Sequence, residues 1–88
     1  MLYINNMSLL KEGQKAKVKK LYVQGSMRRR LLDIGLVCGT DIRCLQKSPS
    51  GDPKAYLIRG AVIALRNEDA EKIIVEYEDE LSLPYANF

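Results

Sequence analysis

The chain has 88 residues, of which 47% are hydrophobic and 28% are charged, with a formal net charge of +3. A chain of this length and composition forms one small globular domain and is not typical of disordered proteins. The longest strongly apolar stretch, at 61–65, is far shorter than the roughly 20 residues that cross a bilayer, and the N-terminus lacks a secretory-signal pattern. We therefore expect a cytoplasmic protein with no membrane span of its own. A single domain should cover 1–88, with a core at about 7–76 and a tail at 79–88.

The first predicted strand is KAKVKKLYV at 15–23. Lysine alternates there with apolar residues until the phase slips at Lys19 and Lys20, which predicts a half-buried strand with a bulge. A two-turn helix is expected next, near 27–34. Ser26 would cap its start, and Gly35 would end it in the left-handed conformation. Its packing side would consist of Met27, Leu31 and Ile34, with Leu32 off that side.

Further strands are expected along the rest of the chain. TDIRCLQK at 40–47 alternates and places Ile42 and Cys44 on one face, whereas SPSGDP at 48–53 is a loop. Two apolar runs at 54–59 and 61–66 flank Gly60 and predict a tight hairpin. The side chains expected to share faces in that hairpin are Tyr56 with Ile58, and Ile63 with Leu65.

The predicted elements end with a one-turn helix and a last strand. Asn67 precedes Glu68 and Asp69 in the pattern of a helix N-cap, and KIIVEYE at 72–78 returns to a strand pattern. About five short strands and one or two short helices in under 90 residues favour a mainly β fold. We expect a small, partly closed barrel, of which the SH3-like barrel is one type.

Charge is distributed unevenly along the chain. Between 11 and 30, eight lysines and arginines stand against Glu12 alone, whereas between 68 and 80 seven acids stand against Lys72 alone. If the first and last predicted strands are neighbours, these blocks neutralise each other across the pair. Such pairing weakens the case for nucleic-acid binding.

The run Arg28, Arg29 and Arg30 has two interpretations. It is either the solvated side of a helix that packs on the barrel, or an anion-binding site. The anion would belong to a phosphate backbone or to an acidic partner protein. A nucleic-acid interface usually adds aromatic stacking residues or a longer basic stripe. We keep a small basic barrel that binds nucleic acid as the alternative function.

Catalysis and metal binding find little support in the residues. Histidine is absent, so Ser-His and Cys-His pairs are excluded, and no phosphate-loop motif occurs. Cys38 and Cys44 are six residues apart, which matches no zinc-knuckle spacing, and two buried, unreactive thiols are the expected state. We therefore predict no catalytic residue, no metal ligand and no cofactor, and expect at most weak iron binding by carboxylates.

A series of short motifs is spread over about 7–76. The motifs are Leu10-Lys11-Glu12-Gly13, Ala16, Val18, Arg30-Leu31-Leu32, Ile34-Gly35-Leu36, Gly39-Thr40, Pro49, Gly51-Asp52-Pro53, Arg59-Gly60, Ala64-Leu65-Arg66 and Glu68-Asp69-Ala70. No single motif is specific, but their order and spacing together are. In this order and spacing the chain strongly resembles the FeoA family, the small cytosolic component of bacterial ferrous iron uptake.

The resemblance implies an SH3-like barrel, no catalytic activity, and a partner: FeoB, the membrane ferrous iron permease with a cytosolic GTP-binding domain. We expect the chain to dock on the cytosolic part of that permease and to modulate transport. An apolar anchor ringed by arginine is the composition that interfaces favour. The predicted contact patch is therefore Arg28, Arg29, Arg30, Leu31 and Leu32.

The tail leaves several alternatives open. Leu81, Leu83, Tyr85 and Phe88 could pack back on the barrel, mediate weak self-association, or be disordered. The sequence does not choose among them.

Overall fold

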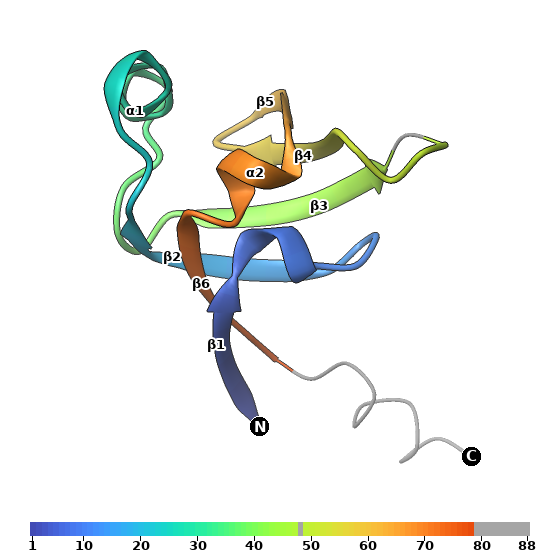
Figure 1. Ribbon diagram of the computed structural model, residues 1–88. Coiled ribbons are helices and arrows are strands. Elements are labelled where there is room, and N and C mark those ends of the chain that lie inside the picture. The colour runs from blue at the N-terminus through green and yellow to red at the C-terminus, as the bar shows by residue number, and fades with distance from the viewer. Residues whose placement is uncertain (48, 79–88) are drawn as a thin grey trace, which may run out of the picture.

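The computed structural model describes residues 1–47 and 49–78, so the predicted tail at 79–88 lies outside the described residues. Within them, one antiparallel sheet has the strand order β1-β6-β2-β3-β4-β5 and curls around a single core (Figure 1). The strands are β1 (Leu2–Asn6), β2 (Lys15–Leu21), β3 (Asp41–Lys47), β4 (Lys54–Ile58), β5 (Ala61–Leu65) and β6 (Ile73–Glu78). The helices are η1 (Met7–Leu9, a 3-10 turn), α1 (Gly25–Asp33) and α2 (Asn67–Ala70). The predicted mainly β fold is confirmed.

Buried and exposed side chains alternate along the strands, and the buried ones form the inner face of the sheet. Ala16 and Val18 of β2 are buried while the lysines between them are exposed, and the register shifts between Val18 and Lys20, which confirms the predicted bulge. Ile42 and Cys44 of β3 are buried on one face, as predicted. The other buried hydrophobic residues are Met7, Leu10, Val23, Leu31, Leu36, Tyr56, Ile58, Leu65, Ala70, Ile73 and Val75.

The hairpin around Gly60 joins β4 to β5. Arg59 has a φ of 49° and Gly60 a φ of 83°, the two positive values that a tight hairpin turn of type I′ requires. Tyr56 and Ile58 are fully buried on the inner face. Of the pair expected on β5, Leu65 is buried and Ile63 packs half-buried against the core. The predicted hairpin is therefore confirmed.

β1 is a strand that the sequence analysis missed. It pairs with β6, from Leu2 opposite Glu78 to Asn6 opposite Ile74, and lies at the sheet edge. All but its last residue are exposed, so the strand has no apolar alternation to reveal it. Tyr3 instead stacks on Tyr77 of β6, with ring centroids 5.9 Å apart.

Both predicted helix N-caps, Ser26 and Asn67, are wrong. α1 begins at Gly25, one residue before Ser26, after an N-cap residue, Gln24, that makes no side-chain capping bond. Asn67 is the first residue of α2 and not its cap. Its backbone N–H donates to Asp52 Oδ1 at 2.9 Å and its Nδ2 donates to the Gly51 carbonyl at 3.2 Å, which ties α2 to the loop between β3 and β4.

The basic and acidic blocks do meet between β2 and β6, as the charge pattern suggested. Lys17 is opposite Glu76 in the register, and Lys19 Nζ lies 3.7 Å from Glu76 Oε1. The side chain of Lys17 turns instead toward β3, the other neighbour of β2, where its Nζ donates to Asp41 Oδ1 at 2.8 Å. That hydrogen bond, followed by the charge of Asp41, raises the pKa of Lys17.

Candidate partner-binding surface

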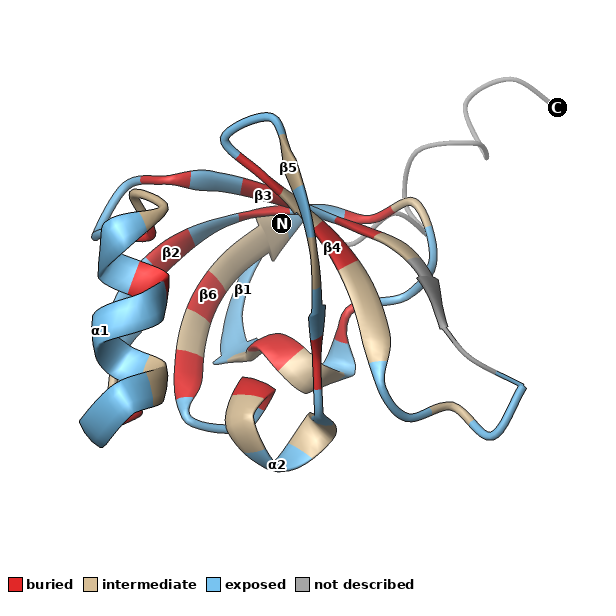
Figure 2. Ribbon diagram, turned by 90° about the horizontal axis from the view of Figure 1, so that it is seen from above, coloured by how far each residue is buried: buried red, intermediate tan, exposed pale blue. Residues whose placement is uncertain are grey.

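Helix α1 forms the connection from β2 to β3 and packs beside the sheet with one side only (Figure 2). Leu31 is 1% exposed within the core, and Met27 and Ile34 pack half-buried against it. The predicted packing side is therefore confirmed. The remaining face of α1 is exposed to solvent.

The end of α1 is closed by a Schellman motif. The Gly35 N–H donates to the Leu32 carbonyl at 2.9 Å and the Leu36 N–H donates to the Leu31 carbonyl at 2.9 Å. Gly35 has a φ of +92°, the left-handed value that was expected there. The next residue, Leu36, is fully buried, so the motif anchors the helix end to the core.

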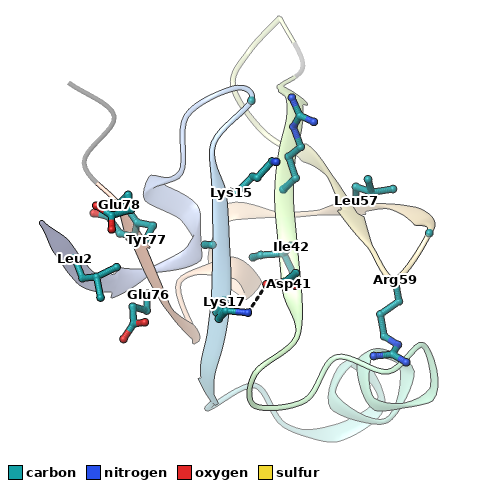
Figure 3. Close-up of a pocket in the computed structure, with 14 residues that line it drawn as sticks. Leu2, Lys15, Lys17, Asp41, Ile42, Leu57, Arg59, Glu76, Tyr77 and Glu78 are labelled. Atoms are coloured by element: carbon teal, nitrogen blue, oxygen red, sulfur yellow. Dashed lines mark hydrogen bonds and ion pairs between the residues drawn. The ribbon is translucent and has the colours of Figure 1, made fainter. Parts of the chain in front are cut away.

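Arg59 in the β4–β5 turn covers Gly35. A Cβ at Gly35 would lie 2.4 Å from Arg59 Cδ, so any other residue at this position would make the Arg59 side chain shift. Figure 3 shows Arg59 extending from the hairpin toward α1. A cation beside the last turn of a helix interacts favourably with its dipole. Arg59 therefore links the hairpin to α1, a contact that sequence periodicity could not reveal.

Thr40 holds the loop between α1 and β3. This buried residue, 5% exposed, donates from Oγ1 to the Gly35 carbonyl at 2.9 Å and accepts from the Val37 N–H at 3.0 Å. The loop displays Val37, 47% exposed, and Cys38. The prediction of two buried thiols is thus wrong for Cys38 and correct for Cys44.

The three arginines of α1 differ in their surroundings. Arg28 Nη1 donates to the carbonyls of Leu21 and Val23, at 3.2 and 3.5 Å, and so braces the backbone between β2 and α1. Arg29 and Arg30 are exposed, and neither side chain makes an ion pair or hydrogen bond with the described part of the chain. Of the three arginines on α1, Arg29 and Arg30 therefore have guanidinium groups that are available to a partner.

The two leucines of the predicted patch separate. Leu31 is buried, because it faces the core, so it offers no surface to a partner and is withdrawn from the patch. Leu32 is 40% exposed, and Arg28 and Arg29 stand four and three residues before it, on the neighbouring face of the helix. We call Arg28, Arg29, Arg30 and Leu32 the helix patch. Val37 is an exposed apolar neighbour in the chain that the sequence analysis did not single out.

Within residues 1–47 and 49–78, no three His, Cys, Asp or Glu side chains gather where they could hold a metal ion. The same residues contain no helix that is long and apolar enough to cross a membrane.

An antiparallel sheet curled around one core, with a short basic helix displayed between β2 and β3, defines a small barrel of the SH3-like class. The family model for the FeoA domain matches residues 5–77. The chain belongs to the FeoA family, which is associated with ferrous iron transport.

Three known proteins show the likeness in detail. An Fe(2+) transport protein A/Fe(2+) transporter FeoB fusion protein of Porphyromonas gingivalis is 39% identical over 70 residues, which are 80% of this chain and 8% of that protein. The FeoA protein of Chlorobium tepidum is 35% identical, with a TM-score of 0.79 over 84% of this chain and 70% of that one. The zinc complex of Stenotrophomonas maltophilia FeoA, described as a prokaryotic SH3 domain protein, is 27% identical to this chain. Its TM-score is 0.70, and the match covers 80% of this chain and 87% of that one.

Proposed function

We propose that this chain is a non-enzymatic accessory protein that docks in the cytoplasm on a FeoB-type ferrous iron permease and modulates transport. The fusion protein of Porphyromonas gingivalis carries the proposal, since it joins a segment 39% identical to this chain to a FeoB transporter. Fusion of two modules raises their effective concentration for each other, which is useful when the modules bind each other.

The helix patch supports this proposal physically. Leu32 supplies an exposed apolar side chain, and Arg29 and Arg30 supply guanidinium groups without a partner in the described residues. Arginine beside an apolar anchor is enriched at protein interfaces. Because Leu31, Met27 and the Schellman motif hold α1 from behind, the patch is presented on a fixed helix and little is lost in ordering it on binding.

Substitution of Leu32 by aspartate tests this surface. We expect the affinity for the detergent-solubilised permease to fall by at least about tenfold, which is about 1.4 kcal/mol, because a charge replaces the apolar anchor. Arg29→Glu should weaken binding too and should reduce its dependence on salt. Titration followed by light scattering or calorimetry measures both.

The matched control is Leu9→Asp, since Leu9 is an exposed leucine, 52% accessible, on η1 outside the helix patch. It should bind within about twofold of the unaltered chain, a difference well under 1 kcal/mol. Unchanged binding by a folded Leu32→Asp variant would remove α1 from the interface.

A further inference from the structure

One row of outward-facing side chains crosses the sheet from β6 to β5. The register aligns four of them across β2, β3, β4 and β5, namely Lys15, Arg43, Leu57 and Val62. Glu78 continues the row on β6, because the β2–β6 register, extended by two residues, places it beside Lys15. We call these five residues the outer row. Figure 3 shows Glu78, Lys15 and Leu57 in this order along an open groove of about 860 Å³.

The centre of the outer row carries two facing positive charges. Lys15 and Arg43 are exposed and lie opposite each other on β2 and β3, and like charges directly opposite destabilise a sheet. Neither side chain makes an ion pair or hydrogen bond with another residue of 1–47 and 49–78. An anion bound between them would therefore relieve a repulsion as well as form new contacts.

The acids of the same groove are held by other cations. Asp41 pairs with Lys17 at 2.8 Å, Glu76 with Lys19 at 3.7 Å, and Glu78 with the N-terminal amine at 3.1 Å. The adjacent row of the sheet alternates in sign across the strands, from Glu76 to Lys17 to Asp41. The outer row instead places two cations side by side, so its centre attracts a negative charge from outside the sheet.

Beyond these cations the outer row becomes apolar. Leu57 on β4 is half-buried, and Val62 on β5 is 64% exposed. β5 is the edge of the sheet and reads AVIAL, without a charged residue to protect it. A ligand that continues from the two cations toward β5 therefore needs apolar groups.

The spacing of the outer row matches that of an extended polypeptide. Since strands lie about 4.8 Å apart, Leu57 and Val62 lie about 7 and 12 Å along the row from the midpoint of the two cations. In an extended chain, the side chains on one side recur every two residues, which is about 7 Å. An acidic side chain between the cations therefore brings the side chains two and four residues later close to Leu57 and Val62.

We propose that the outer row binds an extended acidic segment of a partner protein, in which an aspartate or glutamate is followed two and four residues later by apolar residues. The carboxylate lies between Lys15 and Arg43, where the guanidinium group can hold both oxygens and the ammonium group adds a second charge. The apolar side chains cover Leu57 and Val62. The outer row shares no residue with the helix patch, so this proposal does not rest on docking to the permease.

The same arrangement favours an acidic peptide over a nucleic acid. A nucleic acid carries a phosphate charge at every nucleotide along its length. The outer row offers it two neighbouring cations, with the carboxylate of Glu78 on one side and the apolar Leu57 and Val62 on the other. One carboxylate with apolar neighbours fits this sequence of charges better than a series of phosphates.

Titration of the isotope-labelled full-length chain with a synthetic peptide, followed by nuclear magnetic resonance, tests the proposal. The probe is the blocked heptapeptide Ser-Glu-Ser-Leu-Ser-Val-Ser, and the matched control carries glutamine in place of glutamate. We expect the amide signals of Lys15, Arg43 and Leu57 to shift while those of α1 stay in place, with about tenfold higher affinity for the glutamate peptide. A site with a Kd of about 1 mM would be nearly saturated at about 10 mM peptide. No shift at that concentration, or equal binding of the two peptides, would overturn the proposal.

Neutral substitutions show whether the two cations hold the carboxylate. The double variant Lys15→Gln, Arg43→Gln should fold, because the change removes a repulsion, and should bind both peptides equally weakly. The control Lys11→Gln, Lys72→Gln removes the same charge from exposed lysines off the outer row and should keep the preference for glutamate. If the first variant does not fold, Arg43→Gln alone replaces it. A preference for glutamate that persists without these cations would contradict the charge pairing.

Two further samples distinguish other occupants of the outer row. A short oligothymidylate should bind more weakly than the glutamate peptide, and tighter binding with shifts at Lys15 and Arg43 would assign the two cations to phosphate. Dilution of the chain without peptide should leave the signals of the outer row in place. Movement of those signals on dilution would assign the surface to a second copy of the chain. Either of these contrary results would overturn the proposal.

Discussion

Truncation of Leu31 to alanine should lower the free energy of unfolding by about 2–5 kcal/mol, whereas Leu32→Ala should change it by about 0.5 kcal/mol or less. The two leucines are adjacent in the sequence and equal in size, but one is 1% exposed and the other 40% exposed. Leu31→Ala leaves a cavity between α1 and the sheet, because the side chain packs within the core cluster. Urea unfolding followed by circular dichroism measures the shift in midpoint at unchanged slope.

The size of the Leu31 effect matters for interpreting the binding experiments. A chain of this length has a total stability on the order of 4–13 kcal/mol, so the Leu31 variant can lose much of its folded population. Weak binding by that variant would then report unfolding and not the interface. Equal destabilisation by the two truncations would contradict the orientation of α1 described above.

Tyr56→Ala should cost about 3–5 kcal/mol, the largest effect of any single truncation that we expect. Tyr56 is the largest fully buried side chain among the described residues, and it lies on β4 in the middle of the inner face. Its hydroxyl donates to the Met7 carbonyl at 3.4 Å and so links β4 to η1. The control is Tyr56→Phe, which keeps the ring and should cost only about 0.5–1.5 kcal/mol.

The same tyrosine gives stability a dependence on alkaline pH. Burial raises the pKa of Tyr56 well above its usual range. The unfolded chain can release the phenol proton above about pH 10 while the folded chain holds it, so the contribution is complete below that pH and declines above it. Comparison with Tyr56→Phe in urea at pH 8 and pH 11 isolates this slope. A stability difference between the two chains that does not change with pH would show that the phenol is accessible to water.

Periodicity predicted those parts of the fold in which one face is buried. Lys15 to Val18, Ile42 with Cys44, and the two sides of Gly60 all alternate between core and solvent, so their strands were expected correctly. β1 was missed because both of its faces are exposed, and because its partner strand β6 is distant in the sequence, with Leu2 paired to Glu78 and Asn6 to Ile74. Local sequence patterns cannot predict a pairing between strands so far apart in the chain.

The candidate surface was predicted in part. The helical period correctly placed Leu31 toward the core, yet its inclusion in the contact patch ignored that same burial. The bracing of two backbone carbonyls by Arg28 depends on where the chain turns between β2 and α1, and the contact of Arg59 with Gly35 depends on how the β4–β5 hairpin lies against the helix. Both are properties of tertiary structure, which is why the residues alone do not show them.

Titration of this chain into its detergent-solubilised FeoB-type permease, with and without guanine nucleotide, tests the docking role most directly, with a nonspecific DNA duplex as the control. We expect saturable binding to the permease and none to the duplex at low salt. The guanine-nucleotide dependence of the affinity would identify the state of the permease that the chain recognises. Binding to the duplex alone, with an affinity that falls steeply as salt rises, would mean that the arginines of α1 hold phosphate and would contradict docking on the permease.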